Sequence, residues 1–142
     1  MTKTITAEDA LSKIESHVAL PELRTEVAKI GEVLHQGDVY LTRVPKTWPR
    51  GDLLGTRQIA VGQQIGARHV VEGDVKVYAG KKLPAGFKLP EGAQESDLLG
   101  PVVEAGGETI LTHPEHAHHA LSEGCYQVTY QWDMTTMRRV VD

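Results

Sequence analysis

Four of the chain's seven histidines lie within one stretch of seven residues, His113–His119. Glu115 lies among them, and a strong β-strand pattern begins soon afterwards, at Tyr126. Imidazole and carboxylate groups are common protein ligands of zinc, iron and manganese. Imidazole is also the side chain that changes charge near neutral pH. Ligand or acid–base chemistry is therefore expected in this stretch before anywhere else in the chain.

The metal hypothesis has a defined ligand set. His116 and His118 are two residues apart, so in an extended chain their rings project to the same side. His113 and His116 flank Pro114-Glu115, a pair that favours a turn and could bring these two rings together. The candidate ligands are His113, His116 and His118, with Glu115 as fourth ligand or base and with His69 and His119 as further candidates. Such a set could hold zinc, or leave an open position on manganese or iron for activating water.

Simpler interpretations of the same stretch stay open. Histidines before a strand often lie in an exposed loop or bond to backbone groups, and the spacings of zinc fingers and zincins are absent from this sequence. Clustered histidines among carboxylates could also form a contact that responds to pH. A nucleophilic pair of Cys125 with a histidine is a weaker alternative, because the strand pattern supplies no orienting third group. We therefore expect no catalytic residue and no bound cofactor, and the balance is against an enzyme.

Charge is divided along the chain. The net charge is −4, from 15 Lys and Arg against 19 Asp and Glu. Basic residues gather in 43–90, whereas residues 91–133 contain no Lys or Arg. The basic region 43–68, with Trp48, could bind nucleic acid or phosphate, although the negative net charge argues against it. The basic and acidic segments could instead complement each other, either between subunits or within one.

The N-terminal segment carries the helical patterns. Thr6 can cap a first helix, and Pro21 separates it from a second. Apolar residues at helical spacing form a stripe in each helix: Leu11, Ile14 and Val18 in the first, and Leu23, Val27, Ile30 and Leu34 in the second. We expect these helices to pack on the rest of the domain or on a neighbouring subunit.

The remainder of the chain has the pattern of short strands. The predicted strands are 39–44, 57–61, 68–72, 75–79, 101–105, 108–113 and 126–133, with a short edge strand near the C-terminus. Residues 45–54 and 80–97 are predicted loops, and Gly73-Asp74 and Gly106-Gly107 are predicted turns. The sequence thus predicts a mainly β protein: an antiparallel barrel or sandwich of seven to eight short strands, preceded by two helices. Residues 1–36 form the helical segment and 37–142 the β-domain of one folding unit.

The C-terminal third resembles a loosely defined group of small, uncharacterised β-rich proteins of bacteria and their phages. The shared pattern is Gly37-Asp38-Val39, His113-x-x-His116, then Leu121, Gly124, Tyr126, Val128 and Gln131, and finally Arg139-Val140-Val141-Asp142. A bend at Gly66–His69 is similar. Where the group often continues Gln-Arg-Glu-Tyr, this chain has Gln131-Trp132-Asp133-Met134. The resemblance implies a compact β fold and implies no activity.

Together these features predict a non-enzymatic β-domain that works by assembly. It would form a homo-oligomer or attach to a larger structure such as a phage particle, through its helices and its 80–97 loop. No secretory signal, membrane-length apolar run or cysteine pair is present, so we expect a cytoplasmic protein without a membrane partner. The alternative is a metal-binding protein or metal-dependent enzyme, and nucleic-acid or phosphate binding stands third.

Overall fold

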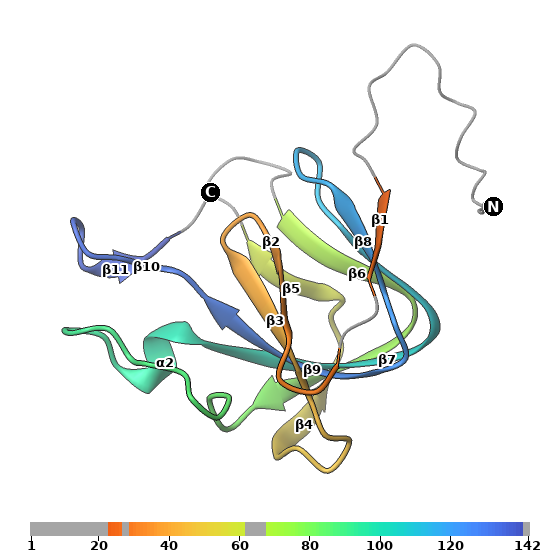
Figure 1. The fold of residues 1–142 in the computed structure, drawn as a ribbon, viewed down its shortest axis with the longest axis horizontal. Helices are drawn as coiled ribbons and strands as arrows, with labels where there is room; N and C mark the ends of the chain where they lie inside the picture. Colours follow the sequence, from red (N-terminus) through yellow and green to blue (C-terminus); the bar gives the residue numbers. More distant parts are fainter. Residues whose placement is uncertain (1–22, 27–28, 62–67, 141–142) are drawn as a thin grey trace.

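A nine-stranded sheet and a separate two-stranded ribbon make up most of the structure (Figure 1). The computed structural model describes residues 23–26, 29–61 and 68–140. The strands of the sheet are β1 (Leu23–Glu26), β2 (Val33–Gln36), β3 (Val39–Val44), β4 (Arg50–Leu54), β5 (Gln58–Val61), β6 (Arg68–Gly80), β7 (Leu99–Thr112), β8 (His118–Leu121) and β9 (Gly124–Tyr130). The ribbon pairs β10 (Trp132–Asp133) with β11 (Arg138–Arg139), and one short helix, α2 (Glu95–Leu98), precedes β7.

Long strands form the centre of the sheet. β6 runs antiparallel to β7, from the pair Val70–Thr112 to the pair Tyr78–Val102. The other edge of β7 pairs with β9 and then with β8. β4 and β5 pair with the outer edge of β6, β3 and then β2 follow β9, and β1 lies parallel to β8. The sheet is therefore almost entirely antiparallel, and β1 and β2 end its path without closing a barrel.

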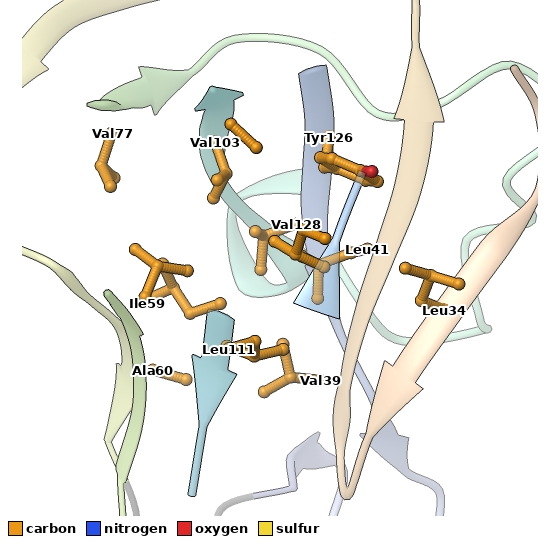
Figure 2. Packing of buried hydrophobic residues seen from close by; sticks show 13 residues of the cluster. Leu34, Val39, Leu41, Ile59, Ala60, Val77, Val103, Leu111, Tyr126 and Val128 are labelled. Atoms are coloured by element: carbon orange, nitrogen blue, oxygen red, sulfur yellow. The ribbon is translucent and has the colours of Figure 1, made fainter. Parts of the chain in front are cut away.

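The core lies on the inner side of the curved sheet (Figure 2). Leu41 of β3, Val103 of β7 and Tyr126 of β9 are fully buried, and they belong to one cluster with Leu34 of β2 and Ile59 of β5. Figure 2 shows these side chains pointing toward a common interior from strands far apart in the sequence. The mainly β fold predicted from the strand patterns is confirmed.

Tyr126 provides a direct check of this packing. Its hydroxyl donates to the Ser122 carbonyl oxygen at 2.7 Å and lies 3.0 Å from the Ser122 hydroxyl. We expect Tyr126→Phe to lower the free energy of unfolding by about 1 kcal/mol, the net value of one such hydrogen bond. Urea denaturation measures the loss. Tyr40→Phe is the matched control, because the structure records no hydrogen bond from the Tyr40 hydroxyl to a described residue, and an equal loss there would contradict the assignment.

The second predicted helix is wrong where the structure describes it, because residues 23–26 and 33–36 are strands. The first predicted helix lies outside the described residues. β2 buries Leu34 and Gln36 and exposes Val33 and His35, which is a period of two. Leu34 fits both the helical stripe and this alternation. Pairing with β3 decides between them, since tertiary contacts override a short apolar pattern.

The turns predicted in the middle of β6 and β7 are also wrong. Both strands continue through the glycines that suggested turns, and their register shifts between Gly73 and Val75. Gly73 has φ +103°, and a Cβ there would collide with the carbonyl of Glu108. Glycine is thus needed for a bulge in a continuous strand, a role that its sequence signal shares with a turn.

Strand β9 is more buried than its alternation predicted. Tyr126 and Val128 face the core as expected, but Gln127 and Thr129 on the other face are also buried, at 0% and 2% exposure. Trp48, from the loop before β4, covers this second face and donates from Nε1 to Gln127 Oε1 at 3.0 Å. The predicted half-exposed strand is therefore a strand covered on both sides.

The structure agrees with most of the predicted loop 80–97 but with only part of the predicted loop 45–54. Residues 45–54 include the strand β4, so this segment is only partly a loop. Residues 81–94 have no helix or strand, as expected, and lead into α2. This long loop packs against the β10–β11 ribbon, where Gly92 lies beside the Met137 side chain. In the described part of the chain, no helix has the length and apolar character needed to span a membrane.

Candidate functional site: a buried histidine cluster

Three imidazole rings meet at one end of the sheet, and we call them the histidine cluster: His69, His113 and His116. The ring centres of His69 and His113 are 4.5 Å apart, those of His113 and His116 are 4.3 Å apart, and those of His69 and His116 are 6.1 Å apart. His69 and His113 are 2% and 3% exposed. The β6–β7 ladder explains the meeting, because Val70 pairs with Thr112 and so brings the neighbours His69 and His113 together.

His69 has an oxygen at each ring nitrogen. Gln36 Nε2 donates to the carbonyls of Leu111 and Ala117, at 3.1 and 2.8 Å, so its Oε1 accepts from His69 Nδ1 at 2.8 Å. His69 Nε2 lies 3.3 Å from Oδ1 of the buried Asp38 carboxylate. Both ring nitrogens of His69 therefore face an oxygen that can accept a hydrogen bond.

His113 accepts a hydrogen bond at Nδ1, the ring nitrogen from which His69 donates one. The backbone N–H of Glu115 donates to His113 Nδ1 at 2.9 Å, so this nitrogen carries no proton and the neutral ring holds its proton on Nε2. His118 Nε2 lies 3.2 Å from the His113 carbonyl oxygen, to which it donates. Burial lowers the pKa of His118, the bond to His113 opposes this shift, and the nearby His119 lowers the pKa further. The structure thus favours neutral His113 and His118.

The predicted ligand set is only partly brought together. His113, His116 and His69 meet, but the Glu115 side chain is exposed and acts here through its backbone. His118 and His119 are consecutive in β8, so their rings project to opposite faces of the strand. Among the described residues, no group of three His, Cys, Asp or Glu side chains is arranged to hold a metal ion. The geometry therefore does not support a metal site, and the bonds at both ring nitrogens of His69 and at Nδ1 of His113 are those of a hydrogen-bonded cluster.

Gln36 and Asp38 were missed by sequence reasoning. The sequence pattern includes Gln36 in the helical segment 1–36, and Asp38 lies just after its end. The available signal was Gly37-Asp38, a two-residue turn before the strand 39–44, with Gly37 at φ +60°. Reading this pair as a hairpin turn would have placed Gln36 opposite Val39 in a strand, which is the observed pairing.

The basic region is largely used within the fold. Arg43 donates to the Ser122 hydroxyl and the Glu123 carbonyl, and Arg57 donates to the Gly73 carbonyl. Arg50 lies 5.0 Å from the Tyr78 ring centre and 3.9 Å from the Glu104 carboxylate. These contacts give Arg43, Arg50 and Arg57 partners within the fold. Cys125 is buried, and Arg50 Nη2 lies 3.4 Å from its sulfur, so its recorded polar neighbour is an arginine and not a histidine.

The lowered pKa of His118 predicts loss of stability in acid. A histidine whose folded pKa lies below its unfolded value binds more protons when unfolded, so its contribution is complete above roughly pH 6.5 and falls as the pH drops below it. We expect the urea midpoint of His118→Gln to fall less than that of the wild type between about pH 7.5 and 5.5. His35→Gln, at an exposed position of β2, is the control. Parallel pH profiles for wild type and His118→Gln would contradict the prediction.

The fold and this site define a small β-protein with a buried histidine cluster at one end of its sheet. Residues 35–131 match the family described as Domain of unknown function (DUF8820), and the chain belongs to that family. This match agrees with the resemblance to an uncharacterised group. No curated protein and no solved structure matches the chain significantly.

Proposed function

We propose that this protein is a non-enzymatic β-domain that acts through assembly, by pairing with further copies or attaching to a larger structure. The edge of the sheet at β2 carries the proposal, because no further strand of the described residues pairs with it. β2 ends the strand path, and Val33 on it is 54% exposed. Ile30, just before the strand, is 65% exposed. Exposed apolar side chains beside an unpaired strand edge are a common basis for association.

The outer edge of β2 presents backbone groups that can pair with a strand of another molecule. The N–H of Arg43 donates to the Glu32 carbonyl at 2.9 Å, and Leu34 and Gln36 lie opposite Leu41 and Val39. Because antiparallel pairs alternate, the peptide groups of the intervening residues Val33 and His35 point away from β3. Residues 33–36 contain no Pro, Lys or carboxylate, the devices that usually prevent an edge strand from pairing.

The proposal extends to the setting of the assembly. The resemblance of His113-x-x-His116 and the following strand to small proteins of bacteria and phages supports a place in the cytoplasm or in a phage particle. Attachment to such a structure can use the same exposed strand edge as self-association. A homo-oligomer is the simpler form, because a C2 interface repeats one surface patch on both subunits.

Size-exclusion chromatography with light scattering tests the proposal. Wild-type protein at neutral pH is expected to have a mass above that of the monomer, and Val33→Lys is expected to be monomeric because a charge on the edge opposes pairing. Leu53→Lys is the matched control, since Leu53 is 61% exposed but lies on β4. A wild-type monomer at high protein concentration, in both low and high salt, would contradict self-association.

A further inference from the structure

Gln36 connects the proposed assembly edge with the histidine cluster. It is one of two residues of β2 whose side chains are buried, the other being Leu34. The Gln36 amide bonds to His69, to the Leu111 carbonyl of β7 and to the Ala117 carbonyl in the loop 113–117. The position of β2 is therefore coupled to the cluster through one buried side chain.

The cluster accommodates one added proton better than two. His69 can hold two protons, because Gln36 Oε1 and Asp38 Oδ1 both face it. His113 cannot, because a second proton on Nδ1 would point at the Glu115 N–H that now donates to it. Protonation of His113 would also place a second positive charge in a ring centred 4.5 Å from His69.

The surroundings contain further titratable groups. Asp38, from the β2–β3 turn, faces His69, so its charge offsets the first proton. His116 and the exposed Glu115 belong to the loop of His113, and His118 bonds to the His113 carbonyl. His119 follows on β8, where Arg24 of β1 lies opposite it in the ladder. Histidines predominate in this set, so acid adds like charges at one place.

We infer that the histidine cluster is a pH-sensitive latch on β2: mild acid protonates the cluster, releases the loop 113–117 and loosens the edge strand. The release breaks the Glu115–His113 bond first, and the Gln36–Ala117 bond follows because it ties β2 to the same loop. As a means of regulation, the latch rests on the proposed assembly through β2. Its structural part, the opening of the loop and strand, stands independently of any assembly.

Hydrogen exchange measures the opening directly. Exchange is followed at about pH 7.5 and 5.5, on either side of the ordinary imidazole pKa of roughly 6.5, and is corrected for the intrinsic effect of pH. Amides of 33–36 and 113–119 are expected to lose protection by about tenfold or more in acid, while those of the β6–β7 pairs Val77–Val103 and Tyr78–Val102 keep theirs. An unchanged protection of both segments would overturn the inference.

Two variants identify the group responsible. His113→Asn keeps an acceptor near the Glu115 N–H but cannot be protonated, so it is expected to reduce the acid response clearly, leaving only the part that belongs to His118. His35→Asn, on the exposed side of β2, is expected to retain it. A full acid response in His113→Asn would overturn the inference. If His113→Asn does not fold, the imidazole shifts of His113 and His69 in the wild type report the same proton uptake, and uptake without loss of amide protection would also overturn it.

Light scattering at the same two pH values separates the latch from the assembly. Wild-type protein that dissociates in acid together with the loss of protection supports both. A monomer at both pH values with the exchange response intact contradicts the proposed assembly and leaves the latch standing. An oligomer that persists unchanged in acid while β2 loses protection overturns the control of the edge by the cluster.

Discussion

Replacing Gln36 by leucine is expected to lower the free energy of unfolding by about 3–5 kcal/mol, because two buried groups and one partly buried group lose their partner at once. These are the Nδ1–H of His69 and the carbonyls of Leu111 and Ala117. Gln36 is 1% exposed, so water cannot replace the amide. Leaving one buried polar group unsatisfied costs roughly 1–3 kcal/mol, and the three costs accumulate.

Urea denaturation followed by tryptophan fluorescence measures this loss. Gln131→Leu is the matched control, because the Gln131 side chain is exposed, and its effect should stay within about 0.5 kcal/mol. A second check is the combination of Gln36→Leu with His69→Leu. The double variant should lose clearly less than the sum of the single losses, since both remove members of one network. A loss below about 1 kcal/mol for Gln36→Leu would show that the network contributes little.

Local patterns predict where strands lie in the sequence better than they predict whether two neighbouring strands form one continuous strand. The strand 39–44 was assigned with its observed bounds, because Val39 and Leu41 alternate with polar or aromatic residues and a Gly-Asp turn precedes them. Gly73 predicts a turn that would divide β6 into two strands, but a glycine is typical of a bulge as well as of a turn. Only the pairing with β7 across both halves distinguishes these, and pairing is not a local property of the sequence.

The candidate site depends on the same non-local information. The histidines of 113–119 were recognised from their spacing, and His69 was included as a further candidate. Its meeting with His113 follows from the β6–β7 register, which pairs Val70 with Thr112 over a long stretch of chain. Gln36 and Asp38 carry no motif of their own, and they were missed because their strand was read as a helix. The spacing of the histidines predicts a metal site, whereas the partners of His69 and of His113 Nδ1 make the observed site a hydrogen-bonded cluster.

Gln127 is the second position where a single substitution is expected to have a large effect. Gln127 lies in β9 at 0% exposure, with its Oε1 accepting from Trp48 Nε1. Its Nε2 donates to the Gly100 carbonyl at 2.8 Å and lies near the carbonyls of Pro101 and Val128, at 3.2 and 3.0 Å. This one amide therefore anchors both the loop before β4 and the start of β7 on the outer face of β9.

We expect Gln127→Leu to lower the free energy of unfolding by about 3 kcal/mol, since the partly buried indole N–H of Trp48 and the buried Gly100 carbonyl both lose their partner. Gln127→Glu is the more informative variant. It keeps an acceptor for Trp48 but replaces the donor with a carboxylate that faces carbonyl oxygens, so the buried charge should make it less stable than Gln127→Leu at neutral pH.

Acid should reverse part of that difference. Burial and the facing carbonyls raise the pKa of the introduced carboxyl above its unfolded value, so the folded state binds the proton more tightly and Gln127→Glu gains stability as the pH falls. The protonated carboxyl can then donate to Gly100, as the amide does. Urea midpoints of both variants at about pH 8 and 5 measure the change. If Gln127→Glu were as stable as the wild type at pH 8, the amide would not be acting as the donor to Gly100, and the anchoring of β7 would have to come from its strand pairs alone.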